Sequence, residues 1–255
     1  MKGESRTRKY DPPILKLIWG LSDGICAYPG CGRPLIMPAT ENDPHAIIGK
    51  ICHIISLSPT GPRADTSKSI PYLNSYDNLI LFCGAHHDEV DLQENTFTVE
   101  TLQQWKADHE KRALMRIQQA MPGVGFHELE IVCRGILGSA GQPSDPAIPT
   151  PPIKKMEKNG LTERLRFKMS IGLSKFPEVE NYVSGISRLD PPFPERLKAG
   201  FIKSYNEFLE QDFKGDSLFE AMVEFANGGS GSFDRKAAGL AVLCYLFHKC
   251  EVFEP

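Results

Sequence analysis

The chain has 255 residues, enough for one large domain or two small ones, and we expect two. Its formal net charge is -3, so no global positive field draws it to nucleic acid, and phosphate contacts must come from a local patch. No apolar run approaches the ~18 residues of a membrane span, and the first residues lack the apolar core of a secretory signal. We therefore expect a cytoplasmic protein with no membrane partner.

The cysteines point to a metal site. They number seven and are scattered, which favours a reducing compartment over disulfides. Cys26 and Cys31 enclose a Pro-Gly turn that can aim both thiols at one ion. Cys83 and His86 form a second close pair, and structural zinc takes four N or S ligands from two such pairs. The sequence predicts a structural Zn²⁺ site; the alternative is that Cys83 is simply a buried apolar residue and the first two are bystanders.

The sequence around these pairs predicts a strand, a second strand and a helix, in that order. β-Branched residues indicate a first strand that contains His53. A loop rich in Pro, Gly, Asp and Ser then leads to a second, apolar strand. The predicted elements are a strand at 47–57, a loop at 58–75, a strand at 79–82, a helix from 88, a short strand at 96–99 and a helix at 100–120.

This region resembles the HNH (ββα-metal) nuclease family in three stretches, CHIISLSPTGPR, SYDNLILFC and GAHHDEVD. The resemblance covers about residues 20–118 and implies a zinc-stabilised ββα-metal domain that hydrolyses DNA phosphodiester bonds. By position, it implies that His53 is the base that deprotonates water and that Asn78 orients this base. His87 is then the ligand of one catalytic divalent ion, Mg²⁺ or Mn²⁺.

Cys52 departs from the family pattern, because many members carry an Asp or Glu immediately before the first His as a second metal ligand. A thiol prefers softer metals than magnesium. Either the ion is held by His87 and another carboxylate, for which Asp91 one helical turn further is the nearest, or the site is weakened. A small residue before this His, a PxGPR-like loop and a CxxHH element together resemble the HNH effectors of bacterial anti-phage systems, so we do not interpret Cys52 as inactivating.

The adjacent histidines His86 and His87 have different predicted tasks. At the start of a helix, neighbouring side chains diverge by about 100°. One imidazole can therefore face the zinc while the other faces the active site.

Basic residues near the motif are few. Arg63 is our candidate contact to nucleic acid, and the N-terminal residues Lys2, Arg6, Arg8 and Lys9 form a basic run. The alternative for such a run is a solvated tail.

The second half of the chain is expected to be mainly helical after two strands. Loose alternation at 127–136 and strict alternation at 164–173 predict two paired, half-buried strands. The Pro-rich segment 138–152 predicts a surface linker or loop. The last helix, from Asp234 to about Cys250, is apolar almost all round and should be buried in its domain or in a partner. The predicted class is α+β, with a nuclease domain at 1–120, a strand plus linker at 121–160 and a mainly helical domain at 161–255.

The stretches PERLKAGFIKSYNEFLEQDFKGDSLFEAMVEFANGG and AAGLAVLCYLFHKCEVFEP resemble the small C-terminal domain of effectors of ABC-three-component defence systems. The resemblance implies an ABC-type ATPase as partner. We expect assembly through a face of the last helix that carries Leu240, Leu243, Tyr245 and Phe247. The alternative is a dimerisation domain, which gives a homo-oligomer.

Two functions compete. The first is a metal-dependent DNA endonuclease, an effector of a bacterial anti-phage system. The second is a non-catalytic, zinc-stabilised module that binds nucleic acid or a protein. The set of His53, Asn78 and His87 favours the enzyme, because a scaffold needs only the zinc ligands.

Overall fold

The computed structural model describes residues 8–138, 152–249 and 253. The chain divides into two compact units, Met1–Ala113 and Leu114–Pro255. The boundary lies within helix α4, Val99–Ala120, rather than at its end. The described residues form mainly helices with a few short strands, which agrees with the predicted α+β class. None of the described helices is both long and apolar enough to cross a bilayer.

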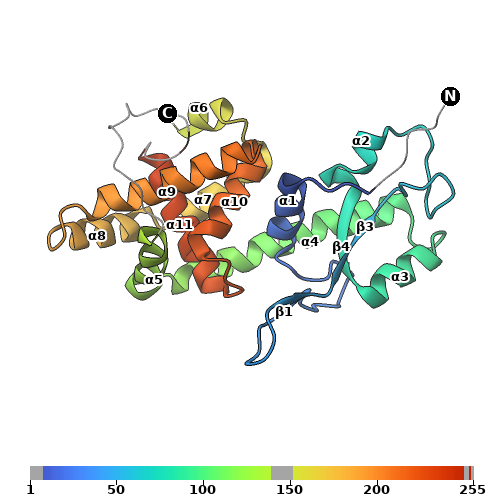
Figure 1. The fold of residues 1–255 in the computed structure, drawn as a ribbon, viewed down its shortest axis with the longest axis horizontal. Helices are drawn as coiled ribbons and strands as arrows, with labels where there is room; N and C mark the ends of the chain where they lie inside the picture. Colours follow the sequence, from blue (N-terminus) through green and yellow to red (C-terminus); the bar gives the residue numbers. More distant parts are fainter. Residues whose placement is uncertain (1–7, 139–151, 250–252, 254–255) are drawn as a thin grey trace. The chain divides into compact units, whose positions relative to one another are not determined.

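Unit 1 combines short strands with helices (Figure 1). Its elements before α4 are α1 Pro12–Ser22, β1 Ile36–Met37, β2 Ala46–Ile47, β3 Gly49–His53, α2 Ile70–Leu73, a 3₁₀ turn Tyr76–Asn78, β4 Leu79–Cys83 and α3 Gly84–Leu92.

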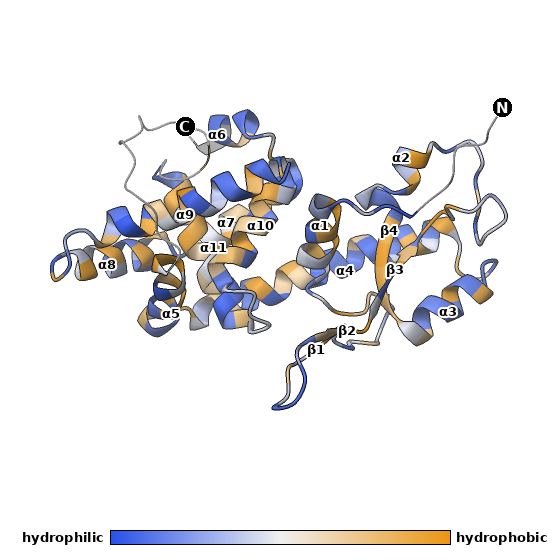
Figure 2. Ribbon diagram, in the orientation of Figure 1, coloured by the Kyte–Doolittle hydropathy of each residue, from blue (hydrophilic) through white to orange (hydrophobic). Residues whose placement is uncertain are grey.

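Strands β3 and β4 pair antiparallel and helix α3 follows β4 directly, so that the predicted order of strand, strand and helix is confirmed. The register places His53 opposite Leu79 and Gly49 opposite Cys83. All five residues of β4 are buried, and the strand is hydrophobic along its length in Figure 2. Such a strand is buried on both faces. The tight pairing therefore fixes the two ends of β4, one beside His53 and the other at α3.

Two expected strand boundaries in unit 1 are wrong. The first strand ends at His53 rather than at residue 57. The short strand expected at 96–99 is absent, since α4 begins at Val99. The reason is a helix cap: the Thr98 hydroxyl accepts a hydrogen bond from the Thr101 N–H at 3.3 Å, which satisfies a backbone donor of the first turn.

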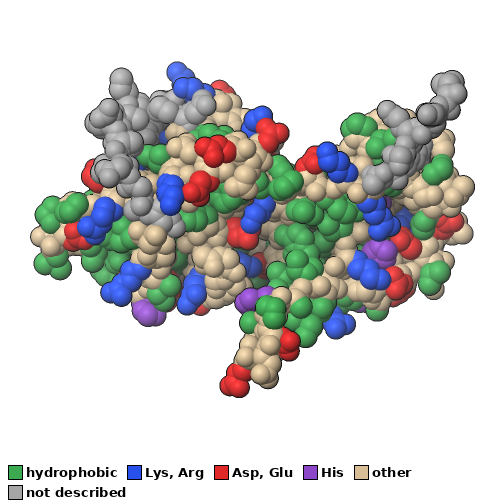
Figure 3. Space-filling view, in the orientation of Figure 1, with side chains coloured by type: hydrophobic (Ala, Val, Ile, Leu, Met, Phe, Trp, Pro, Cys, Tyr) green, Lys and Arg blue, Asp and Glu red, His purple; other side chains and the backbone are tan. Residues whose placement is uncertain are grey.

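The pair β1–β2 forms an exposed hairpin at the edge of unit 1. Figure 3 shows hydrophobic side chains along it and acidic ones at its tip. Ile36, Met37 and Ile47 are 44%, 50% and 68% exposed. This hairpin lies outside the β3–β4 sheet.

Unit 2 is a helical bundle (Figure 1). After the end of α4 and a 3₁₀ turn Met121–Gly123, its helices are α5 Phe126–Leu137, α6 Pro152–Lys158, α7 Glu163–Leu173, α8 Phe176–Ser187, α9 Phe193–Glu210, α10 Gly215–Asn227 and α11 Phe233–His248. Most of the Pro-rich segment, 139–151, lies outside the described residues.

The two strands expected in this half are helices α5 and α7, so those predictions are wrong. Period two in 164–173 placed Phe167 inside and Lys168 outside, but Phe167 is 52% exposed and Lys168 is 4% exposed. Lys168 enters the core because Glu220 on α10 neutralises it at 2.7 Å. Helix α5 also packs into the unit 2 core through Val132 and Ile136. Helix α5 is therefore part of the unit 2 core.

Helix α11 is the centre of unit 2. Every residue from Ala237 to Phe247 is buried, and the helix packs against α5, α7, α8 and α10. The last helix was expected to be buried either in its own domain or in a partner, and the structure shows that it is buried in its own domain. The face expected to mediate assembly is not available, since Leu240 and Leu243 are 0% exposed and even Tyr245 is only 7% exposed.

Candidate metal centre and pocket

Four predicted ligands converge in unit 1. Cys26 and Cys31 lie in the turn after α1, Cys83 ends β4 and His86 lies in the first turn of α3. Their ligand atoms all lie within 4.8 Å of one another. The Nδ1 atom of His86 is 3.3 Å from the Cys83 sulfur and 3.5 Å from the Cys26 sulfur. The predicted convergence of the two pairs is confirmed, and the cluster can hold a metal ion such as zinc.

The turn that presents the first pair is set by its sequence and attached to β4. Gly30 has φ +79°, a left-handed conformation that glycine adopts without strain. This closes the turn so that the Cys31 N–H donates to the Tyr28 carbonyl at 3.1 Å. A second hydrogen bond joins this turn to strand β4: the Ala27 N–H donates to the Leu81 carbonyl at 2.9 Å. The thiols of the turn are thereby brought to the end of β4.

Aromatic packing orients His86. Its ring stacks on Tyr28 with 3.8 Å between centroids and an angle of 10°. The Tyr28 hydroxyl donates to Glu89 at 2.8 Å, and Trp105 packs edge-on against the Tyr28 ring. Contacts of this kind fix a metal-binding imidazole in its working orientation.

The thiols have unequal environments. Burial raises the pKa of Cys26 to about 12. Burial acts in the same direction on Cys83, but the N–H of His86 and the neighbouring thiols outweigh it, so the pKa of Cys83 lies below its usual value. Zinc deprotonates the thiols that coordinate it, and three sulfurs with one nitrogen match its preferred donors.

A pocket of about 380 Å³ lies beside β3 and α3. It is lined by Arg8, His53, Ser56, Leu57, Ser58, Pro59, Pro62, His87 and Asp91. Thus His86 belongs to the metal cluster and His87 faces the pocket, as the 100° divergence predicted.

His53 is held at the pocket by two side chains that the sequence analysis missed. The Oδ1 atom of Asn74 is 3.4 Å from its Nε2, and the Tyr10 hydroxyl is 3.5 Å from its Nδ1. Burial lowers the pKa of His53 below its usual value, while the bond to Asn74 opposes this shift. A lowered pKa favours the neutral imidazole, the form that accepts a proton.

Asn78 was expected to orient the His53 ring, but its side chain bonds the backbone instead. It is 1% exposed, and its amide group bonds the main chain of Ile55 and the carbonyl of Leu73. Its own carbonyl accepts from the Ile54 N–H at 2.8 Å. Asn78 therefore fixes the backbone that follows His53.

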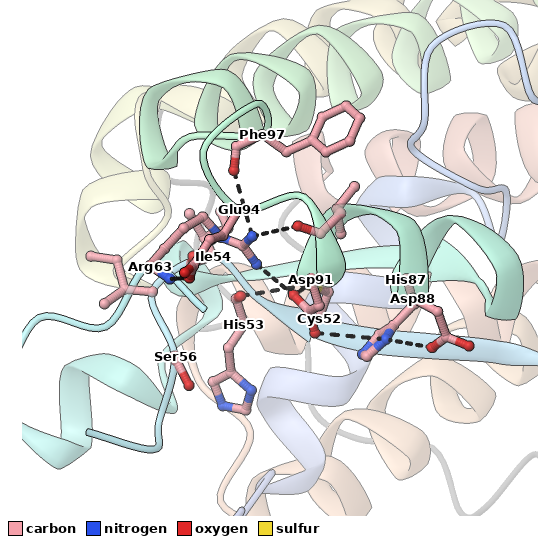
Figure 4. A network of polar contacts seen from close by, with 12 residues as sticks. Cys52, His53, Ile54, Ser56, Arg63, His87, Asp88, Asp91, Glu94 and Phe97 are labelled. Atoms are coloured by element: carbon pink, nitrogen blue, oxygen red, sulfur yellow. Dashed lines mark hydrogen bonds and ion pairs between the residues drawn. The ribbon is translucent and has the colours of Figure 1, made fainter. Parts of the chain in front are cut away.

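Arg63 is not a surface contact for phosphate, so this prediction is wrong. Its side chain is 4% exposed, and its guanidinium donates to the carbonyls of Ile54 and Val90 and to Asp91 at 2.6–2.8 Å. Its backbone is left-handed, with φ 52°, and its N–H donates to Glu94. Figure 4 shows Arg63 in this network, between Ile54 and Asp91. The residue ties the segment after β3 to the end of α3.

Cys52, His87 and Asp91 form a second cluster, with ligand atoms within 4.8 Å of one another. The Cys52 sulfur is 3.7 Å from Asp91 Oδ1, and His87 Nδ1 is 3.8 Å from Asp91 Oδ2. Burial, followed by the Asp91 charge, raises the pKa of Cys52 to about 12. Magnesium takes oxygen ligands in octahedral geometry, and this set offers one carboxylate. The residues therefore do not fit the expected Mg²⁺.

The residues that surround the pocket differ in how far the sequence indicated them. Arg8 belonged to the basic run, and it lines the pocket while Arg63 does not. Lys2 and Arg6 lie outside the described residues. Tyr10 and Asn74 are 43 and 21 residues from His53 in sequence, and no local pattern links them to it.

Comparison with protein-family models and with curated proteins found no match to this chain.

Proposed function

We propose that the protein is a metal-dependent endonuclease of the HNH type that hydrolyses phosphodiester bonds of DNA. The observation that carries the proposal is the pocket in which a buried histidine, His53, faces the same space as His87 and Asp91. A base and a cation-binding pair at one cavity are what hydrolysis of a phosphodiester needs.

His53 supplies the proton acceptor. With Asn74 Oδ1 accepting from Nε2–H, the neutral ring presents the lone pair of Nδ1. The Tyr10 hydroxyl lies on that side, 3.5 Å from Nδ1. Asn78 keeps the adjoining backbone in place through its bonds to Ile55. His53 acts as a general base on a water molecule, a role worth roughly 10²- to 10⁴-fold in rate.

The pocket also offers groups for the phosphate. Arg8 is exposed at its rim and supplies positive charge in a chain of net charge -3. A divalent cation at His87 and Asp91 would stabilise the negative charge that develops on the leaving oxygen. With so few phosphate contacts, we expect weak DNA binding with a shallow salt dependence, because the slope of log affinity against log salt grows with the number of phosphates neutralised.

A second function, a non-catalytic zinc-stabilised binding module, is favoured by one observation. Asp91 is already paired with Arg63 at 2.6 Å, and Cys52 stands where a carboxylate ligand is expected. If this pairing prevents cation binding, the Cys and His cluster stabilises a scaffold without hydrolytic activity.

The two functions are separated by cleavage of supercoiled plasmid by the purified full chain, with Mg²⁺, Mn²⁺, Co²⁺ or Zn²⁺ added and with EDTA. We expect cation-dependent nicking that His53→Ala reduces at least about 10²-fold. The matched control is His127→Ala, which removes an exposed histidine of α5. Undiminished nicking by His53→Ala excludes His53 as the base, and no nicking with any cation supports the binding module.

A further inference from the structure

We infer that the pocket contains a thiolate metal site, in which Cys52, His87 and Asp91 hold a borderline divalent cation of the zinc and cobalt class. A fourth coordination position is then open to the pocket. The assignment of this ion to catalysis rests on the proposed function, whereas the binding of the ion does not. The site is separate from the cluster of Cys26, Cys31, Cys83 and His86.

The spacing of the three donors suits one ion. The Cys52 sulfur lies 3.7 Å and the His87 Nδ1 lies 3.8 Å from the two oxygens of Asp91. Zinc binds sulfur at about 2.3 Å and nitrogen or oxygen at about 2.0–2.2 Å, so tetrahedral angles place its donors about 3.3–3.6 Å apart. The third separation, between the Cys52 sulfur and the His87 nitrogen, is at most 4.8 Å, so side-chain shifts on the order of 1 Å bring all three donors to bonding distance.

The exposure of the three side chains shows which side of the site faces the pocket. Cys52 is 1% exposed and does not line the pocket. The His87 and Asp91 side chains are 14% and 31% exposed, and both line the pocket. An ion among them has the thiolate behind it and the cavity in front, where His53 also lies. Three protein ligands and one open position are typical of catalytic zinc sites, whereas four ligands are typical of structural ones.

Arg63 supports the site from the protein side. Its guanidinium binds Asp91 Oδ1 at 2.6 Å, which leaves Oδ2 directed to His87 (Figure 4). A second residue that binds a ligating carboxylate in this way fixes its orientation. The positive charges of Arg63 and of the cation together exceed the negative charges of the thiolate and carboxylate. The site therefore attracts an anionic phosphodiester.

Ligand chemistry decides the class of ion. Thiolate selects zinc and other softer cations, and magnesium selects oxygen. Asp88 lies 3.2 Å from the His87 Nδ1 atom, but it is paired with Lys50 at 2.9 Å. Among the described residues near the cluster, Asp91 is thus the one carboxylate that faces both Cys52 and His87.

The test is the metal content of the full chain after saturation with zinc and removal of loosely held metal. We expect two zinc ions per chain for the wild type and one for Cys52→Ser. The matched control, Cys133→Ala, removes a buried thiol of unit 2 that lies in neither cluster, and it should keep both ions. With zinc left in the Cys26 cluster, added Co²⁺ should give thiolate-to-cobalt charge-transfer absorption in the wild type and not in Cys52→Ser.

Two further variants keep the test decisive if Cys52→Ser fails to fold. His87→Ala changes a side chain at the pocket wall and should also retain one ion. Cys52→Asp replaces the sulfur ligand by oxygen, so in the absence of added zinc it should bind Mn²⁺ more tightly than the wild type does, seen by electron paramagnetic resonance. One zinc in the wild type, or two in Cys52→Ser or His87→Ala, overturns the inference.

The outcomes also separate this inference from the proposed function. Two zinc ions that depend on Cys52, without cleavage under any condition, support the thiolate site and contradict the nuclease. Cleavage that is supported by Mg²⁺, with one zinc per chain and no effect of Cys52→Ser, supports the nuclease and contradicts the thiolate site.

Discussion

The side-chain amide of Asn78 bonds the main chain of Ile55 in both directions. Its Oδ1 accepts from the Ile55 N–H at 2.9 Å, and its Nδ2 donates to the Ile55 carbonyl at 2.9 Å. A buried asparagine thereby mimics a strand partner just where β3 ends at His53. The backbone that carries His53 is held without any direct contact between the Asn78 and His53 side chains.

Asn78→Ala should therefore destabilise unit 1. It leaves the Ile55 N–H and the Leu73 carbonyl without these partners, and each such buried group costs about 1–3 kcal/mol. Both tryptophans, Trp19 and Trp105, lie in unit 1, so urea denaturation followed by tryptophan fluorescence reports on this unit.

The control for Asn78→Ala is Asn42→Ala in the exposed β1–β2 loop, which should leave the midpoint unchanged. An unchanged midpoint for Asn78→Ala would contradict the bracing role of Asn78.

Arg63→Ala should lower the free energy of unfolding of unit 1 by about 3 kcal/mol or more. The change leaves the Ile54 and Val90 carbonyls without these donors and Asp91 without its cation, and the loss of one member of such a buried network has a cost of this size. The same fluorescence measurement applies, with exposed Arg33→Ala as control. A stable Arg63→Ala protein with reduced DNA affinity would restore the phosphate-contact interpretation.

Arg8→Ala should show the opposite behaviour. Arg8 is exposed at the pocket, so its loss should leave the unfolding midpoint unchanged, weaken DNA binding and reduce the slope of log affinity against log salt by about 1. Fluorescence anisotropy with a labelled duplex at several salt concentrations measures both quantities. Its neighbour Lys9 is exposed but does not line the pocket, and Lys9→Ala should have a smaller effect. Equal effects of the two variants would indicate a diffuse basic tail.

The buried pair Lys168–Glu220 gives a test for unit 2. Lys168→Met leaves Glu220, 3% exposed, as an unpaired buried charge, at a cost of about 3–5 kcal/mol. The double variant Lys168→Met with Glu220→Met should recover most of this loss, because an apolar pair of similar volume avoids desolvating charges. Urea denaturation followed by far-ultraviolet circular dichroism measures both proteins. A double variant as unstable as the single one would show that the pair has a further structural role.

Short-range spacing made part of the site predictable from the sequence. The close pairs Cys26–Cys31 and Cys83–His86 have few ways to present their donors, and their convergence on one cluster follows once β4 pairs beside the first turn. The divergence of His86 and His87, by about 100°, follows from helix geometry alone. Within each pair the determining distance along the chain is a few residues, whereas the convergence of the two pairs depends on the bond between Ala27 and Leu81.

Long-range pairing decided the rest. Alternation in 164–173 predicted a strand, yet the segment is helix α7, and most of its buried residues are spaced three and four apart. Lys168 belongs to this buried face because Glu220, 52 residues away, neutralises it. Arg63 was expected at the surface, but it is buried against Asp91, 28 residues away. A charged side chain is exposed unless a partner compensates its desolvation. The sequence shows the charge, but only the tertiary structure brings the partner to it.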